Sequence, residues 1–230
     1  AGADVLVDLA RFYIGHDLGE EALGVLATAL EARPLLEQET RFLALRAAAN
    51  TMAGRYADAE ADLAKGALRG DKSAQIWRGY VEAHMGKWVR ANDFFEQGED
   101  LVFAYSDRWA ARFYAIAAEA ALRTNDLDRA RRLAERASSS SERLSSETGA
   151  LLLAQLSEIV DNPEQAYKRY ASLSKDTSEP VAVKAELYRL DLGVRLGHIT
   201  PIEAADQLES LRFRWRGDDT EMATVGILAD

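Results

Sequence analysis

An internal repeat is the feature that most constrains the fold of this chain. Each copy contains a small or polar turn, an aromatic or aliphatic residue, an alanine, and an apolar residue four positions after that alanine. We call the alanine the anchor. The six anchors are Ala22, Ala59, Ala91, Ala130, Ala166 and Ala204, so successive copies lie 37, 32, 39, 36 and 38 residues apart. A period of this length is typical of stacked helix-turn-helix units.

A second regularity accompanies the anchors. Small residues stand twelve positions before the first five of them, namely Ala10, Ala47, Gly79, Ala118 and Ala154. A small side chain at this position lets two helices approach closely, whereas a larger one would overpack the contact at a cost of roughly 1–3 kcal/mol. The chain also has only four prolines and is rich in good helix formers. Each repeat is therefore predicted to be a pair of antiparallel helices.

Local signals place the ends of these helices. Thr200-Pro201-Ile202-Glu203 is a capping box with proline at the first helical position, and Asn162-Pro163 repeats the order of cap and proline. Gly70 and Gly197 stand where helices should end. We expect one domain, residues 1–230, that contains hairpins at about 3–32, 36–69, 72–103, 107–140, 143–175 and 178–214, and a C-terminal capping helix at 219–229.

The best copies of the repeat read G-R-Y-x-x-A-x-x-x-L from Gly54 and G-K-W-x-x-A-x-x-x-F from Gly86. They resemble the tetratricopeptide-repeat family over residues 4–212. The resemblance implies an all-α, right-handed superhelical solenoid of about six hairpins that binds other proteins. Proline follows a hairpin only near Pro34, and the repeats are longer than the family's 34 residues, so we expect longer helices and an irregular superhelix.

In this family the first helix of each hairpin lines a concave groove, and the offset from the anchor then gives the groove residues. The candidates for partner binding are Arg11, Trp77, Tyr80, His84, Glu119, Arg123, Gln155, Tyr188 and Asp191. Aromatic residues mixed with both signs of charge are typical of a surface that docks a peptide or a helix. For Trp77, Tyr80 and Tyr188 the alternative is a place in the hairpin core. Val7, Ala44 and Ile76 replace the lysines of the family's carboxylate clamp, so that mode of binding is not expected.

Several classes of function lack their sequence signals. The chain has no cysteine, no phosphate-binding or nucleophile motif, and histidines at 16, 84 and 198 without metal-ligand spacing. We therefore expect no enzyme, no cofactor and no metal. A net charge of −10 opposes nucleic-acid binding. The sequence has no run of eighteen apolar residues, so direct membrane insertion is not expected.

Three segments allow two interpretations. The alternation Arg212-Phe213-Arg214-Trp215-Arg216 fits either packing under snorkelling arginines or a contact site. Arg216-Gly217-Asp218 fits a helix stop followed by a cap, with an adhesion motif as the alternative. The run from Ser138 to Ser146 fits a loop with a helix cap, with a phosphorylated or hinge segment as the alternative.

The function expected from these observations is that of a scaffold that binds a peptide or helix of another protein. The alternatives are a structural element that self-associates and a peptide-sensing domain of a regulator. Because the sequence begins at Ala1 without methionine, we expect it to be part of a larger protein. The Ala- and Arg-rich composition suggests a soluble cytoplasmic or periplasmic domain of a bacterial protein.

Overall fold

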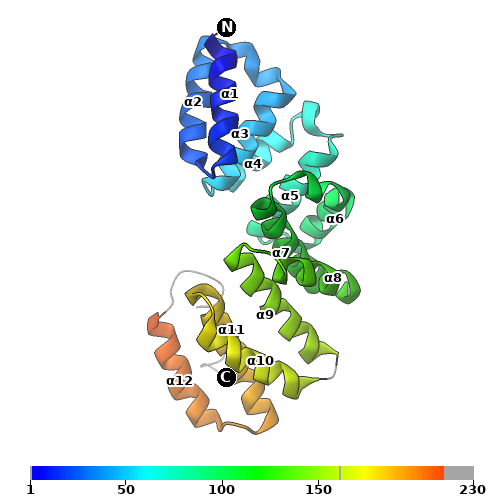
Figure 1. The fold of residues 1–230 in the computed structure, drawn as a ribbon, viewed down its shortest axis with the longest axis vertical. Coiled ribbons are helices and arrows are strands. Elements are labelled where there is room, and N and C mark those ends of the chain that lie inside the picture. The colour runs from blue at the N-terminus through cyan, green and yellow to red at the C-terminus, as the bar shows by residue number, and fades with distance from the viewer. Residues whose placement is uncertain (1, 161, 215–230) are drawn as a thin grey trace. The chain divides into compact units, whose positions relative to one another are not determined.

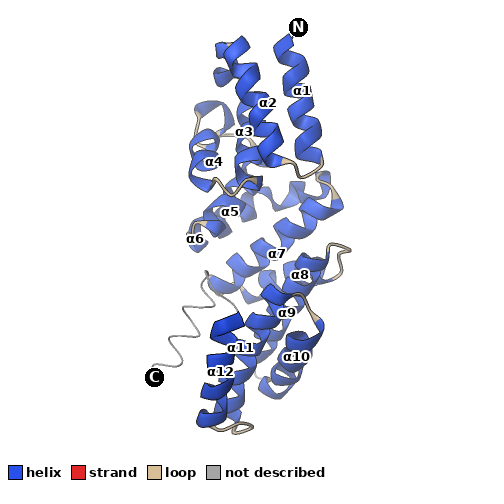
Figure 2. Cartoon of the chain, turned by 90° about the vertical axis from the view of Figure 1, so that its left-hand side faces the viewer, coloured by secondary structure: helices blue, strands red, loops and turns tan. Residues whose placement is uncertain are grey.

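The structure is a computed structural model, and it describes residues 2–160 and 162–214. Every regular element in these ranges is a helix, as Figure 2 shows. The capping helix predicted at 219–229 lies outside the described residues, as do Trp215 and the tripeptide Arg216-Gly217-Asp218.

Twelve α-helices follow one another in pairs over the described residues (Figure 1). The pairs are α1 (Gly2–Gly15) with α2 (Gly19–Ala32), α3 (Thr40–Met52) with α4 (Tyr56–Leu63), α5 (Lys72–His84) with α6 (Trp88–Gly98), α7 (Asp107–Arg123) with α8 (Leu127–Ser138), α9 (Arg143–Ile159) with α10 (Pro163–Asp176), and α11 (Glu179–Leu196) with α12 (Pro201–Arg214). Three short 3₁₀ helices lie between hairpins: η1 (Pro34–Gln38), η2 (Gly66–Leu68) and η3 (Glu99–Ala104).

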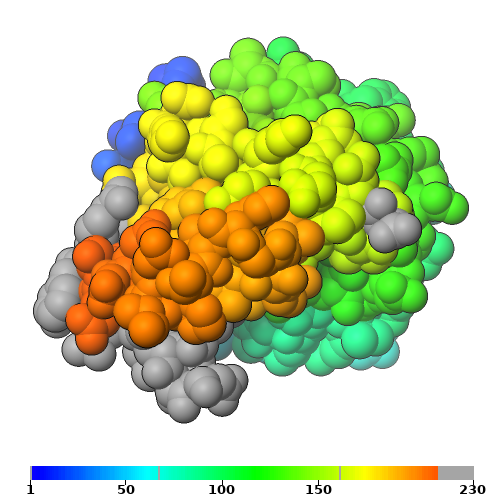
Figure 3. Space-filling view, turned by 90° about the horizontal axis from the view of Figure 1, so that it is seen from below, coloured from blue at the N-terminus to red at the C-terminus, as the bar shows by residue number. Residues whose placement is uncertain are grey.

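The chain forms two compact units, residues 1–106 and 107–230. The first unit contains α1 to α6. There α2 packs on α3 and α4 packs on α5, so that each hairpin is joined to the next through its second helix. The described part of the second unit contains α7 to α12 and repeats this order, with α8 on α9 and α10 on α11. At the C-terminal end of the described part of this unit, α12 packs along α11 (Figure 3). The contact is made by Leu187 and Leu190 of α11 and by Leu208 and Leu211 of α12.

The anchor alanines are the residues around which each hairpin packs. All six are buried, and none is more than 5% exposed. The small residues twelve positions before them are buried as well, and a Cβ atom built on Gly79 would lie 2.8 Å from the ring of Phe95. The repeat motif is therefore a packing motif. Gly79 leaves room for the ring of Phe95, whereas the fourth repeat has Ala118 and the smaller Ala134 at the same two positions.

The two helices of each hairpin are joined by the same turn. A residue in the left-handed region ends the first helix in the five turns that the structure fully describes, with φ between 60° and 74° at Asp17, Gly54, Gly86, Asn125 and Gly197. In all six turns the next N–H donates to the carbonyl oxygen five residues back, as in the 2.8 Å bond from Lys87 to Glu82. This geometry satisfies carbonyl groups that a helix end would otherwise leave without a partner.

A carboxylate on α9 holds the start of α11. Glu147 accepts a hydrogen bond of 2.9 Å from the backbone N–H of Ser178 and another from the Ser178 hydroxyl, and it pairs with Arg143 at 2.7 Å. Burial acts to raise the pKa of Glu147. The hydrogen bonds from Ser178 and Arg143 outweigh it and lower the pKa below its ordinary value.

Replacement of Glu147 by glutamine is expected to lower the free energy of unfolding by about 1–2 kcal/mol at pH 7, because hydrogen bonds to a charged acceptor are stronger than neutral ones. Since the pKa of Glu147 is lowered by folding, its stabilisation is complete above pH 4.5 and is lost as the pH falls through the lowered value. Urea unfolding of both proteins from pH 7 to pH 3 tests this. The two curves of stability against pH should converge in acid, and a constant separation would contradict the assignment.

Candidate functional site

The structure places all nine predicted binding residues on first helices of hairpins. Arg11 lies exposed on α1. The other eight form one group on α5 in the first unit and one group on α7, α9 and α11 in the second unit.

The group in the first unit is aromatic. Trp77 donates a hydrogen bond of 3.1 Å from its ring N–H to the hydroxyl of Tyr105 and packs against the buried core of the hairpins. The ring of His84 lies 4.5 Å from that of Tyr80 and stacks on Tyr56 of α4 at 4.7 Å, with 2° between the planes. Trp77 thus contributes to packing, while the half-buried Tyr80 and the exposed His84 place aromatic rings at the surface of α5.

The group in the second unit is polar, and we call it the first-helix network. Its members are Glu119 and Arg123 of α7, Gln155 and Glu158 of α9, and Tyr188, Asp191 and Arg195 of α11. The three helices are neighbours, because α9 packs on both α7 and α11. Five of the nine predicted residues therefore lie on adjacent helices.

Ion pairs fix the charged members of this network. Arg123 pairs with Glu119 one turn earlier at 2.9 Å. Arg195 pairs with Asp191 at 2.8 Å and also reaches Glu158 on the neighbouring α9. The hydrogen bond from Arg195 to Glu158 raises the pKa of the arginine. These pairs join α9 and α11 and hold the guanidinium groups in defined positions.

Two tyrosines lie among these charges. Burial raises the pKa of Tyr188, and the nearby charge of Glu119 raises it further, against the charge of Arg123 and a hydrogen bond with Gln155. The ring of Tyr170, 5.6 Å from that of Tyr188, is fully buried, and its hydroxyl donates to Glu158 at 2.9 Å. Both hydroxyl groups therefore stay protonated at neutral pH and can act as hydrogen-bond donors.

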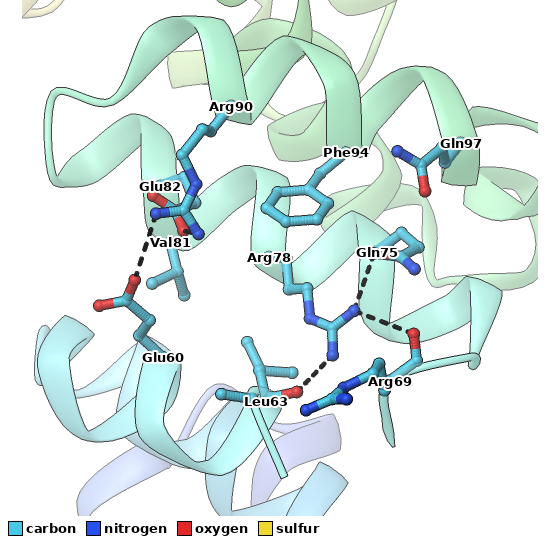
Figure 4. Close-up of a pocket in the computed structure, with 11 residues that line it drawn as sticks. Glu60, Leu63, Arg69, Gln75, Arg78, Val81, Glu82, Arg90, Phe94 and Gln97 are labelled. Atoms are coloured by element: carbon cyan, nitrogen blue, oxygen red, sulfur yellow. Dashed lines mark hydrogen bonds and ion pairs between the residues drawn. The ribbon is translucent and has the colours of Figure 1, made fainter. Parts of the chain in front are cut away.

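A pocket of about 450 Å³ lies in the first unit between α4, α5 and α6, as Figure 4 shows. Among its lining residues, Leu63 belongs to the repeat motif as the apolar residue four positions after Ala59, and none was among the predicted binding residues. Its polar lining includes Arg69, Arg78, Glu82 and Arg90, and its apolar lining includes Phe94. Glu82 is almost fully buried and pairs with Arg90 at 2.6 Å, so this part of the pocket is occupied by an internal ion pair.

A signal for this pocket is present in the sequence. Arg78 stands thirteen residues before its anchor, as Arg46 does in the preceding repeat. A charged residue repeated at a fixed offset on a helix that is mostly buried indicates a recurring polar contact. The motif of small and apolar residues does not include this position, so a search for that motif passes over it.

Two kinds of site are absent from the described ranges. They contain no group of three or more histidine, aspartate or glutamate side chains that could hold a metal ion. No helix within residues 2–160 and 162–214 is both long and apolar enough to span a membrane.

Comparison with known proteins gives one informative result. No family model matches the sequence, and no curated protein matches it either. Among solved structures, the chain is similar to a tetratricopeptide repeat protein from Parabacteroides merdae ATCC 43184, with a TM-score of 0.53 and 15% sequence identity. The similarity covers 99% of this chain and 84% of that protein. The chain therefore has the all-helical fold of the tetratricopeptide-repeat proteins.

Proposed function

We propose that this chain is a protein-interaction scaffold and that the first-helix network binds a peptide or a helix of a partner protein. Folds of the tetratricopeptide-repeat type generally mediate protein–protein interactions and are typically non-catalytic. The observation that carries the proposal is the first-helix network itself. It combines one tyrosine and two arginines with three carboxylates on three adjacent helices, and ion pairs already hold both arginines.

This arrangement suits recognition for an energetic reason. Long charged side chains lose conformational entropy when a partner immobilises them, at about 0.5–1.5 kcal/mol each. Arg123 and Arg195 pair with carboxylates in the absence of a partner, so part of this loss of side-chain entropy already occurs on folding. Tyrosine and arginine, together with tryptophan, are also the residues enriched at the energetic centres of interfaces.

The experiment starts from peptides selected against the intact chain from a random twelve-residue phage library. Each selected peptide is labelled with fluorescein, and its dissociation constant is measured by fluorescence anisotropy. The double substitution Arg123→Ala with Asp191→Ala removes one charge of each sign from the first-helix network. We expect it to weaken binding at least ~10-fold, which corresponds to about 1.4 kcal/mol.

A matched control removes the same charges from a second helix. Asp128 and Arg131 are exposed on α8. The double substitution Asp128→Ala with Arg131→Ala leaves the net charge of the chain unchanged, as the test variant does. It should change binding less than about 2-fold, within the usual effect of a substitution away from an interface. Equal affinity of the selected peptides for both double variants would contradict the proposal.

A further inference from the structure

Three arginines occupy equivalent positions on first helices. Arg46 and Arg78 stand thirteen residues before their anchors, and Arg189 stands fifteen before its anchor in the repeat whose turn is two residues longer. Two of them are neutralised by a carboxylate. Arg46 donates to both oxygens of Asp62 at 2.8 and 2.6 Å, and Arg189 donates to both oxygens of Glu186 at 2.8 and 2.7 Å. These hydrogen bonds raise the pKa of both arginines.

Arg78 has a different environment. Its guanidinium group donates to the carbonyl oxygens of Leu63, Leu68 and Arg69 and to the side-chain oxygen of Gln75 at 3.0 Å. All four acceptors are neutral. Burial lowers the pKa of Arg78, in contrast to the other two arginines. Burial therefore removes part of the hydration of this charge, and the groups that bind it directly are neutral dipoles, which costs free energy that a carboxylate would recover.

The preceding repeat shows where that carboxylate would lie. The two repeats are related by a shift of 32 residues, which superposes Ala59 on Ala91 and Arg46 on Arg78. In the earlier repeat Asp62, Glu37 and Lys65 surround Arg46 and form an ion-pair cluster with it. The same shift replaces these three residues by Phe94, Arg69 and Gln97. All three replacements line the 450 Å³ pocket, together with Arg78 (Figure 4).

The charges around Arg78 also favour an anion, because the two carboxylates of the pocket lining, Glu60 and Glu82, are already paired with Lys87 and Arg90. The positive charge of Arg69 acts to lower the pKa of Arg78, so these two cations oppose each other. Asp71 acts in the other direction, but its carboxylate already caps α5 through the backbone N–H of Ser73 at 2.8 Å. Phe94 contributes its ring face, with its centroid 5.7 Å from the guanidinium carbon of Arg78.

We propose that this pocket binds the carboxylate of an aspartate or glutamate side chain from an acidic peptide. Arg78 and Arg69 pair with the carboxylate, beside Phe94, which stands at the position of Asp62 in the preceding repeat. Leu63, Val81 and Phe94 form the apolar wall against which the methylene groups of the bound side chain pack. The pocket belongs to the first unit and none of its residues is in the first-helix network, so the two proposals can fail independently.

The test uses NMR titration of the full chain with capped tripeptides. The probe is acetyl-Ala-Glu-Ala-amide, the neutral control is acetyl-Ala-Gln-Ala-amide, and inorganic phosphate is the third ligand. We expect saturable shifts of the Arg78 side-chain N–H signal and of the backbone signals of Leu63 and Phe94 with the glutamate peptide alone. Equal shifts with the glutamine peptide, equal shifts with phosphate, or no saturable shift with the glutamate peptide would each overturn the proposal.

Two substitutions at one position sharpen the test. Phe94→Asp introduces a carboxylate at the position of Asp62, so it should neutralise Arg78 from within the chain and weaken binding of the glutamate peptide at least ~10-fold. Phe94→Leu keeps an apolar wall and should change the affinity less than about 3-fold. Both variants leave the contacts of Arg78 with Leu63 and Leu68 in place. Unchanged binding by Phe94→Asp, with a circular dichroism spectrum like that of the parent, would overturn the assignment.

Discussion

Replacement of Gly149 by alanine is expected to lower the free energy of unfolding by about 1–3 kcal/mol. Gly149 lies in α9 where this helix meets α8. A Cβ atom at this position would lie 2.6 Å from the backbone nitrogen of Ser138 and 2.7 Å from the carbonyl oxygen of Ala134. Both atoms belong to the backbone, which cannot turn aside as a side chain can. The two helices must therefore move apart, and the packing between two hairpins is lost.

The control is the same substitution at Gly24 of α2. A Cβ atom there would meet nothing within 4 Å, and the residue lies inside an exposed helical face. Alanine favours the helix over glycine, so Gly24→Ala is expected to stabilise the chain by about 0.5–1 kcal/mol. Urea unfolding followed by circular dichroism measures both variants. Stabilisation by Gly149→Ala as well would show that helix propensity, rather than close approach, decides the result at position 149.

Replacement of Tyr170 by alanine is expected to cost more, about 3–5 kcal/mol, as for other large buried aromatic residues. The side chain is fully buried in the second unit, among Leu151, Val181 and Leu192. Truncation leaves a cavity between α9, α10 and α11. It also removes the hydrogen bond of 2.9 Å that the hydroxyl donates to Glu158.

Tyr170→Phe separates the two contributions. The ring remains and only the hydroxyl is lost, so the expected cost is about 1–2 kcal/mol, the range for a hydrogen bond to a charged acceptor. Glu158 keeps its pairing with Arg195 in this variant. Thermal and urea unfolding of both variants are the measurements. If Tyr170→Phe destabilised the chain as much as Tyr170→Ala, the hydrogen bond rather than the packing would dominate at this position.

The fold was predictable from the sequence because its determinants are local and periodic. An alanine such as Ala91, with Gly79 before it and Phe95 after it, specifies one close helix pair, and the same three positions recur along the chain. Only some of the residues with left-handed backbone conformation could be predicted from the sequence. Gly54, Gly86 and Gly197 are typical of that conformation, whereas Asp17 and Asn125 adopt it without being glycine.

The surroundings of the proposed binding residues were harder to predict, because they depend on contacts between repeats. An offset from the anchor placed Glu119 and Asp191 on first helices, but it could not show that Arg195 would join α11 to Glu158 of α9. The offset of Arg78 from its anchor marks the place of the pocket in the sequence. The environment of Arg78 could not be predicted in this way, because three of its four hydrogen-bond acceptors are backbone carbonyl groups, which sequence patterns do not reveal.

The turn inside each hairpin keeps the same hydrogen bond, whereas the helices and the connections between hairpins vary in length. Copies 32 to 39 residues apart use the same hydrogen bond from five residues back, while α4 (Tyr56–Leu63) is shorter than the other second helices and η1, η2 and η3 differ in length and sequence. For protein engineering, the serine-rich connection around Ser139 and Ser141, both exposed, is the place to insert a reporter or an epitope, and the tight turns are the places to avoid.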